Sequence, residues 1–139
     1  MIILDTNVVS ELIRLNPNSI VLNWVNSKPI DELGITAITV SEILYGIGKL
    51  PVGRRKQILF SKAESMFEED FNERIFPFDE LAAVEYSILV LRREKLGLPI
   101  SMADALIASI SISENYSLAT RNIKDFKNTG VWLINPWNN

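Results

Sequence analysis

Five short and mainly apolar runs, separated by segments with helical spacing, constrain the fold of this chain more than any other feature. None of the runs shows the regular polar alternation of a half-exposed strand. Strands of this kind are typical of a parallel sheet covered by helices on both faces. The pattern therefore predicts an α/β domain of three layers, α/β/α, with a parallel sheet of about five strands. The runs cover residues 1–5, 33–39, 74–78, 116–120 and 130–134.

Helical segments fill the intervals between these runs. The clearest of them has four apolar residues at spacings of three, four and three, which puts them on one face of a helix. These residues are Leu81, Val84, Ile88 and Leu91. Asn18 is the expected cap of the second helix. The expected helices cover approximately residues 7–15, 18–28, 39–48, 53–71, 81–96 and 101–115.

Two absences in the composition restrict the chemistry that this chain can perform. It contains no Cys and no His. A thiolate nucleophile, a zinc–thiolate site and an imidazole base are therefore all excluded. Acid–base or metal chemistry must use Asp and Glu, and carboxylate sites suit hard cations such as Mg²⁺ or Mn²⁺.

Length, charge and hydropathy narrow the class of protein. A chain of 139 residues is expected to form one domain, residues 1–139. The net charge of −3 argues against a surface coated in Lys and Arg, although basic residues gather at 53–56 and 92–95. No apolar run approaches the roughly 18 residues of a membrane span, and the N-terminus does not resemble a signal peptide. We therefore expect no membrane association and a cytoplasmic location.

Four acidic residues are expected at the carboxyl edge of the sheet or close to it, two of them at strand-to-helix junctions. Asp5 ends the first strand, and Glu42 lies in the first turn expected after the second. Asp104 lies in the first turn of the apolar helix that begins at Ser101, and Asp125 follows the strand ending near Thr120. Ligands of parallel sheets bind outside the carboxyl ends of the strands. These acids are therefore candidates for one shared cleft.

Helix capping is the competing explanation for three of these acids. Glu42, Asp104 and Asp125 each follow a Ser, Thr or Asn by three residues, which is the capping-box spacing. The same spacing occurs at Glu64 and Glu114, so it is common in this chain. When Glu42 is considered by itself, capping is favoured over a ligand role. The absence of nearby cations favours a site instead. Asp104 has no Lys or Arg in the fifteen residues after it, and an uncompensated buried carboxylate is costly.

Four motifs together resemble the PIN-domain ribonucleases, in particular the VapC-type toxins of prokaryotic toxin–antitoxin systems. The motifs are "MIILDTNVVSEL", "TAITVSEILYGI", "ISMADALIASIS" and "LATRNIKDF", and the likeness extends to "LPVGRR", "RIFPFD" and "INPW". The resemblance implies a PIN-like fold and a metal-dependent endoribonuclease that cuts RNA, such as tRNA. It also implies 5′-phosphate and 3′-hydroxyl products, a homodimer, and neutralisation by a cognate antitoxin.

The resemblance also implies roles for individual residues. Asp5, Glu42 and Asp104 match the acidic triad of the family. Asp5 and Asp104 are then direct ligands of Mg²⁺ or Mn²⁺, and Glu42 binds directly or through water. Many members have a fourth acid where this chain has Asn122. Asp125 is a possible substitute for that acid, and the count of one or two metals stays open.

Other residues are candidates for supporting roles. Thr6, Asn7 and Thr120 are expected either to position ligands in the site or to act as surface or capping residues. Five arginines are candidate phosphate contacts: Arg14, Arg54, Arg55, Arg92 and Arg93. Apolar residues of the first two helices are expected mostly in the core, with a dimer or antitoxin groove as the alternative: Leu12, Ile13, Val21 and Trp24.

Three other functional classes remain as alternatives. An aspartyl-phosphate hydrolase also begins with a strand ending in Asp, but it requires an acid where this chain has Asn7. A phospho-accepting receiver domain requires an acid pair at the end of the first strand, where this chain has one acid. A catalytically silent PIN-like module that binds RNA or a protein partner is the third alternative, and the neutral Asn122 is the reason to retain it.

Overall fold

The computed structural model describes residues 1–138 and contains a five-stranded parallel sheet. The strand order is β3-β2-β1-β4-β5, and each neighbouring pair is parallel. This confirms the predicted α/β architecture. The strands are β1 (Ile2–Leu4), β2 (Leu33–Thr36), β3 (Ile75–Phe76), β4 (Ser117–Ala119) and β5 (Leu133–Ile134).

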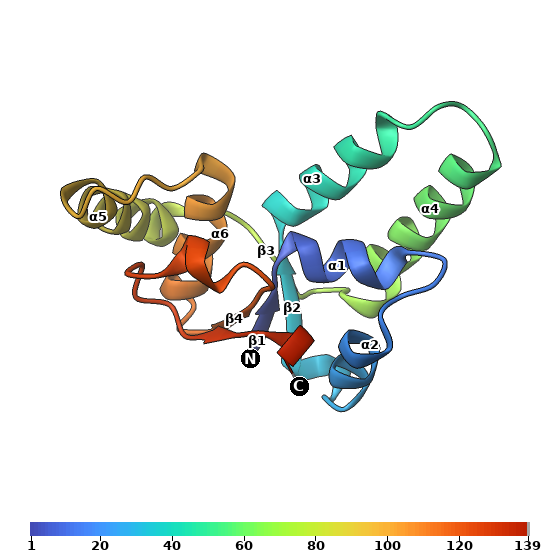
Figure 1. Cartoon of the computed structure of the whole chain (residues 1–139), viewed down its shortest axis with the longest axis horizontal. Coiled ribbons are helices and arrows are strands. Elements are labelled where there is room, and N and C mark those ends of the chain that lie inside the picture. Colours follow the sequence, from blue (N-terminus) through green and yellow to red (C-terminus); the bar gives the residue numbers. More distant parts are fainter. Residues whose placement is uncertain (139) are drawn as a thin grey trace.

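Six α-helices connect and cover the strands (Figure 1). A π-helical turn, Met66–Asp70, extends the fourth helix, and a short 3-10 turn, Pro136–Asn138, follows β5. No helix within residues 1–138 is long and apolar enough to cross a membrane. The helices are α1 (Thr6–Ile13), α2 (Ser19–Asn26), α3 (Ala37–Gly48), α4 (Arg54–Ser65), α5 (Glu80–Lys95) and α6 (Met102–Ser113).

Successive residues of the central strands face two separate cores. In β1, Ile3 packs with α5 and α6, whereas Leu4 packs with α1 to α4. In β4, Leu118 and Ala119 divide in the same way. Side chains alternate between the faces of a strand, so both faces of this sheet are covered. The result is the predicted α/β/α arrangement, with α5 and α6 on one side of the strands and α3 and α4 on the other (Figure 1).

Gly34 allows β2 and β3 to pack closely. A Cβ atom at this position would lie 2.7 Å from Cε2 of Phe76 and 3.2 Å from the Arg74 carbonyl oxygen. The first of these distances is shorter than real Cβ contacts allow, so any larger residue would displace the Phe76 ring. Gly34 therefore helps to fix the path of β2 toward the carboxyl edge, where Thr36 ends the strand.

The helix α3 begins one turn earlier than predicted. Strand β2 ends at Thr36, not at residue 39, and the Thr36 hydroxyl accepts a hydrogen bond from the backbone N–H of Thr39 (3.1 Å). Thr36 is therefore the N-cap, and the predicted capping box of Thr39 and Glu42 is wrong. Because Glu42 lies in the second turn of α3, it is too far from the helix start to act as a cap.

The helix α5 is present as predicted, but its apolar face points away from the core. Leu81 is 67% exposed, and the other three residues of that face are about half exposed. The helix instead packs mainly against α6, through a different face that includes Ala82, Leu89 and Arg93. The four residues define an exposed α5 stripe: Leu81, Val84, Ile88 and Leu91.

Candidate active site

Asp5 is a buried carboxylate at the junction of β1 and α1. Its side chain is 4% exposed, and its backbone N–H extends the sheet by donating to the Ala119 carbonyl oxygen (2.9 Å). Oδ1 accepts from the Thr6 N–H (2.8 Å), which caps α1. Oδ2 accepts from the Thr120 hydroxyl (2.7 Å) and the Asn7 amide (3.2 Å). Three neighbours therefore fix the orientation of this carboxylate.

Glu42 reaches the same region from α3. The Thr6 hydroxyl donates to Glu42 Oε1 (2.7 Å) and lies 2.9 Å from the Thr39 hydroxyl. Thr6 is thus bonded through its N–H to Asp5 and through its hydroxyl to Glu42. This link between residues distant in sequence holds the Asp5 and Glu42 carboxylates on the same side of one pocket.

Asp104 approaches from the first turn of α6. Ser101 is the N-cap, and its hydroxyl accepts from the Asp104 N–H (3.2 Å). The capping prediction is confirmed for the Ser101 side chain. The Asp104 carboxylate nevertheless lines the same pocket as Asp5 and Glu42. This pocket, hereafter the acidic pocket, has a volume of about 490 Å³.

Burial and mutual repulsion disfavour ionisation of two of these acids. Burial raises the pKa of Asp5 from 3.8 to about 6, against the lowering effect of the Thr120 and Thr6 hydrogen bonds. The charges of Asp104 and Glu42 make smaller contributions to this rise in the pKa of Asp5. Burial also raises the pKa of Asp104, and the nearby charges of Asp125 and Glu42 add to this effect. A cation in the pocket would relieve both repulsions.

No basic side chain neutralises these acids by direct pairing. Within residues 1–138 the one ion pair joins Arg14 and Glu11 (3.2 Å). No three acidic side chains in that part of the chain are arranged to hold a metal by themselves. This is compatible with Mg²⁺, which usually takes one or two carboxylates and completes its shell with water and substrate phosphate. The donor set, all oxygen, also fits Mg²⁺ or Mn²⁺.

Asn122 and Asp125, the two residues considered for the position of the fourth acid, lie in different places. Asn122 lines the acidic pocket, whereas Asp125 does not. Asp125 lies in a short 3-10 turn, Ile123–Phe126, and its backbone carbonyl accepts from Arg93 (2.8 Å). Asp125 therefore acts on the pocket only through its charge, and it does not replace the missing fourth acid.

Four lining residues were not among the predicted site residues: Ser10, Glu11, Arg121 and Trp137. Glu11 is buried and accepts from Arg14 and from the Asn18 N–H (3.0 Å). The guanidinium of Arg121 lies over the Trp137 ring, 5.1 Å from its centroid. The position of Arg121 directly after Thr120 was the sequence signal available for it. Trp137 lies in the "INPW" motif, and nothing in its spacing relates it to the acids.

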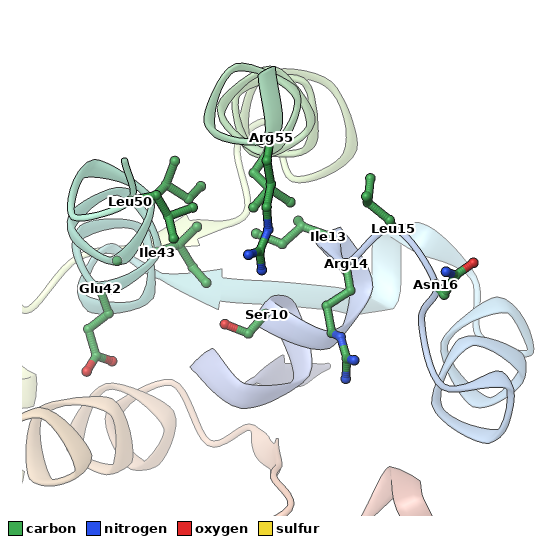
Figure 2. A pocket seen from close by; sticks show the side chains of 12 residues that line it. Ser10, Ile13, Arg14, Leu15, Asn16, Glu42, Ile43, Leu50 and Arg55 are labelled. Atoms are coloured by element: carbon green, nitrogen blue, oxygen red, sulfur yellow. The ribbon is translucent and has the colours of Figure 1, made fainter. Parts of the chain in front are cut away.

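A second hollow, hereafter the apolar groove, adjoins the acidic pocket between α1, α3 and α4. Its volume is about 670 Å³, and its floor is formed by isoleucine and leucine side chains. Figure 2 shows Arg55 reaching from α4 toward the groove. Arg14, the C-cap residue of α1, also lines the groove. Ser10, Arg14 and Glu42 line both hollows. The apolar floor comprises Ile13, Ile43, Ile47, Leu50 and Leu59.

The predicted basic and apolar candidates fall into different environments. Arg14 and Arg55 line the hollows, and Arg54 and Arg92 are exposed on α4 and α5. The prediction for Arg93 is wrong, because it is buried and its guanidinium donates to the carbonyl oxygens of Leu98, Pro99, Asp125 and Lys127. As expected, most of the apolar group on α1 and α2 belongs to the core: Ile13, Val21 and Trp24.

Comparisons with known proteins agree with this architecture. Residues 2–131 match the PIN domain family. The VapC ribonuclease Y4jK of Sinorhizobium fredii is 36% identical over 137 residues, which cover 99% of this chain and 98% of that protein. Toxin FitB of Neisseria gonorrhoeae is also 36% identical and covers 99% of each chain. The crystal structure of FitAcB from Neisseria gonorrhoeae has a TM-score of 0.93 at 35% identity and covers 100% of both chains. The chain therefore belongs to the PIN-domain family.

Proposed function

We propose that this protein is a divalent-metal-dependent endoribonuclease toxin that hydrolyses RNA phosphodiester bonds. One observation carries the proposal: Asp5, Glu42 and Asp104 line one pocket, and no Lys or Arg in residues 1–138 pairs with any of them. Relatives named ribonuclease and toxin support it. The receiver and aspartyl-phosphate alternatives lose their basis, since the chain belongs to the PIN-domain family.

Asp5 and Asp104 are the residues that would hold Mg²⁺ or Mn²⁺. When bound, such a cation lowers the pKa of a water molecule and neutralises negative charge on the phosphate. The hydrogen bonds from Thr6, Thr120 and Asn7 keep the Asp5 carboxylate in one orientation. Because Asn122 is neutral, we propose a site for one cation.

Glu42 is the residue that orients and deprotonates the attacking water. Thr6 donates to its Oε1, so Oε2 is the oxygen that receives the proton. The pocket has room for a phosphate group and the adjacent sugar. Water attacks phosphorus and the P–O3′ bond breaks, so the 3′-oxygen leaves and takes up a proton as the 3′-hydroxyl while the phosphate stays on the 5′ side. The RNA 2′-hydroxyl is not used.

An RNA cleavage assay tests this function directly. Total RNA, including tRNA, is incubated with the purified protein and Mg²⁺ or Mn²⁺, with and without a chelator. We expect discrete fragments with 5′-phosphate ends that disappear when the chelator is present. Fragments formed equally with the chelator would contradict metal dependence. No cleavage with either metal, together with retained RNA binding, would support the catalytically silent alternative.

We propose that the apolar groove binds a segment of a cognate antitoxin. Neighbouring solved structures include toxin–antitoxin complexes, of which FitAcB is one. The groove offers an apolar floor with Arg14 and Arg55 at its sides, which suits an amphipathic segment that also carries acidic side chains. Because Glu42 and Arg14 line both hollows, an occupant of the groove would lie beside the acidic pocket. Such a complex, and the RNA substrate, would be located in the cytoplasm.

We propose that two copies of the chain dimerise through the exposed α5 stripe. Exposed apolar patches of this kind mark interfaces. The helix begins with Asp79 and Glu80 and ends with Arg92 and Lys95, so two antiparallel copies would bring opposite charges together. In that register, Leu81 faces Leu91 of the partner subunit, and Glu80 faces Arg92 of the partner subunit.

Sedimentation analysis of two matched variants tests the dimer. Val84→Glu places a charge in the stripe and is expected to yield monomers. Ala83→Glu is the control, because Ala83 is exposed on the same helix outside the stripe. A wild-type protein that is monomeric at all concentrations, or a Val84→Glu variant that remains dimeric, would contradict the proposal.

A further inference from the structure

The pairing of Arg121 with Trp137 stands out at the rim of the acidic pocket. Three cation–π pairs occur within residues 1–138, and the other two join Lys28 to Trp24 and Lys49 to Tyr45. Only the Arg121–Trp137 pair lines the pocket that contains Asp5 and Asp104. The two side chains come from segments that follow neighbouring strands, β4 and β5, at the carboxyl edge of the sheet.

Backbone hydrogen bonds hold both segments in place. The Arg121 N–H donates to Asn7 Oδ1 (3.3 Å), and Asn7 also contacts Asp5, so the segment is tied to the acids. The Trp137 N–H donates to Asn135 Oδ1 (2.9 Å), and the indole is half-buried against the core that contains α2. The pair is therefore positioned relative to the site rather than carried on a free terminus.

Arg121 is exposed and makes no ion pair with any other residue of the described part of the chain, 1–138. No Asp or Glu carboxylate among residues 1–138 lies within 4.0 Å of its guanidinium, since the one ion pair in that range joins Arg14 and Glu11. A guanidinium plane has two faces, and one of these is directed to Trp137. Nucleobases stack on arginine planes and on aromatic side chains, and such stacking is worth about tenfold or more in affinity per base. A base can stack in this way only when it is unpaired.

We propose that Arg121 and Trp137 form a stacking site for one unpaired nucleobase next to the phosphate that is cut. The substrate is then single-stranded at the cleavage point. This inference rests on the proposed ribonuclease function and adds a site that contacts a base rather than the phosphate. A phosphate contact by Arg121 alone is the competing explanation, and it predicts no dependence on the base.

The test compares binding of two short RNAs in the presence of a chelator, so that cleavage does not interfere. One is a fluorescein-labelled ten-residue oligoadenylate, and the other has the same backbone without bases. We expect the wild-type protein to bind the oligoadenylate more tightly. Trp137→Ala should weaken this binding by about tenfold and leave binding of the abasic RNA unchanged. Trp132→Ala is the matched control, because Trp132 is 81% exposed and does not line the pocket.

A second variant protects the test against a folding defect, because Trp137 also packs on the core. Arg121→Lys keeps the charge of an exposed residue but removes the planar stacking surface. It should lose the preference for oligoadenylate over abasic RNA while the salt dependence of binding stays the same. If Arg121→Lys prefers oligoadenylate over abasic RNA as strongly as the wild type does, the proposal is overturned. The same holds if Trp137→Ala weakens the binding of both RNAs equally. Because binding is measured without cleavage, this result is independent of whether the protein proves to be a nuclease.

Discussion

The acidic pocket and the apolar groove are neighbours with opposite character. They share Ser10, Arg14 and Glu42, yet the first contains the carboxylates of Asp5, Glu42 and Asp104 without basic partners, and the second has an apolar floor with two arginines among its lining residues. The first suits a cation and a phosphate, and the second suits a peptide segment. The difference indicates that catalysis and partner binding can be separated by mutation, although they meet at Glu42.

Replacing Asp104 with Asn should give the largest effect and should be confined to the acidic pocket. The charge is lost while the shape is kept, so RNA cleavage should fall by roughly 10³-fold or more, corresponding to several kcal/mol of lost metal-dependent stabilisation. Antitoxin binding should persist. Asp125→Asn is the control, because Asp125 does not line the pocket, and it should cleave at nearly the wild-type rate. Equal losses in the two variants would show that net charge, rather than position, is responsible.

The raised pKa of Asp5 predicts that the metal-free protein becomes less stable as the pH rises. The folded protein retains this proton up to about pH 6, whereas the unfolded chain loses it near 3.8. The free energy of unfolding should therefore fall as the pH rises through this window, by about 3 kcal/mol. Denaturant titrations of the wild type and Asp5→Asn in chelator should show their difference growing between pH 4 and 6.5. A constant difference would mean that Asp5 ionises normally.

Filling the apolar groove should remove partner binding and spare catalysis. Gly46 lines the groove on α3, and a Cβ there meets nothing within 4 Å, so Gly46→Phe adds a ring without a backbone clash. Antitoxin affinity should fall by about 10²-fold, since buried apolar area is lost. Gly48→Phe is the control, because Gly48 is equally open on the same helix but lies outside the groove. If cleavage falls together with antitoxin affinity, the two hollows are not separable.

Removing the Thr6 hydroxyl, which links Asp5 and Glu42 within the acidic pocket, should have the smallest effect. Thr6→Val deletes the hydroxyl that bonds Glu42 and lies beside Thr39. Because Glu42 then loses its orientation, cleavage should fall by about tenfold with little change in antitoxin binding. Thr6→Ser keeps the hydroxyl and should restore the rate. A slow Thr6→Ser variant would point to packing of the Thr6 methyl group instead.

The sequence was sufficient for the order of elements and for the convergence of the acids. Buried strands are read from apolar runs, and parallel strands bring their carboxyl ends to one edge, so Asp5 and Glu42 could be related without coordinates. Asp104 was added to them from its place in the first turn of an apolar helix without nearby cations. The start of α3 was predicted one turn late, because Thr36 and Thr39 are both competent caps and only the end of β2 decides between them. Local spacing does not contain that information.

Tertiary packing accounts for the other differences. The stripe of α5 has the periodicity of a core face, but the helix packs against α6 through another face, and periodicity cannot show which side is covered. Arg93 was grouped with exposed arginines because its neighbours in sequence are charged, yet its guanidinium satisfies four backbone carbonyls. The contact of Arg121 with Trp137 joins residues after different strands, and it depends on the pairing of β4 with β5.

The location of a bound cation tests the central claim most directly. Crystals of the protein grown with Mn²⁺ would be measured for anomalous scattering, which locates the ion without reference to activity. The account predicts one strong peak in the acidic pocket, within about 2.0–2.5 Å of carboxylate oxygens of Asp5 and Asp104, and no such peak in crystals of Asp104→Asn. Mn²⁺ bound elsewhere, or an acidic pocket without a peak at saturating Mn²⁺, would contradict it.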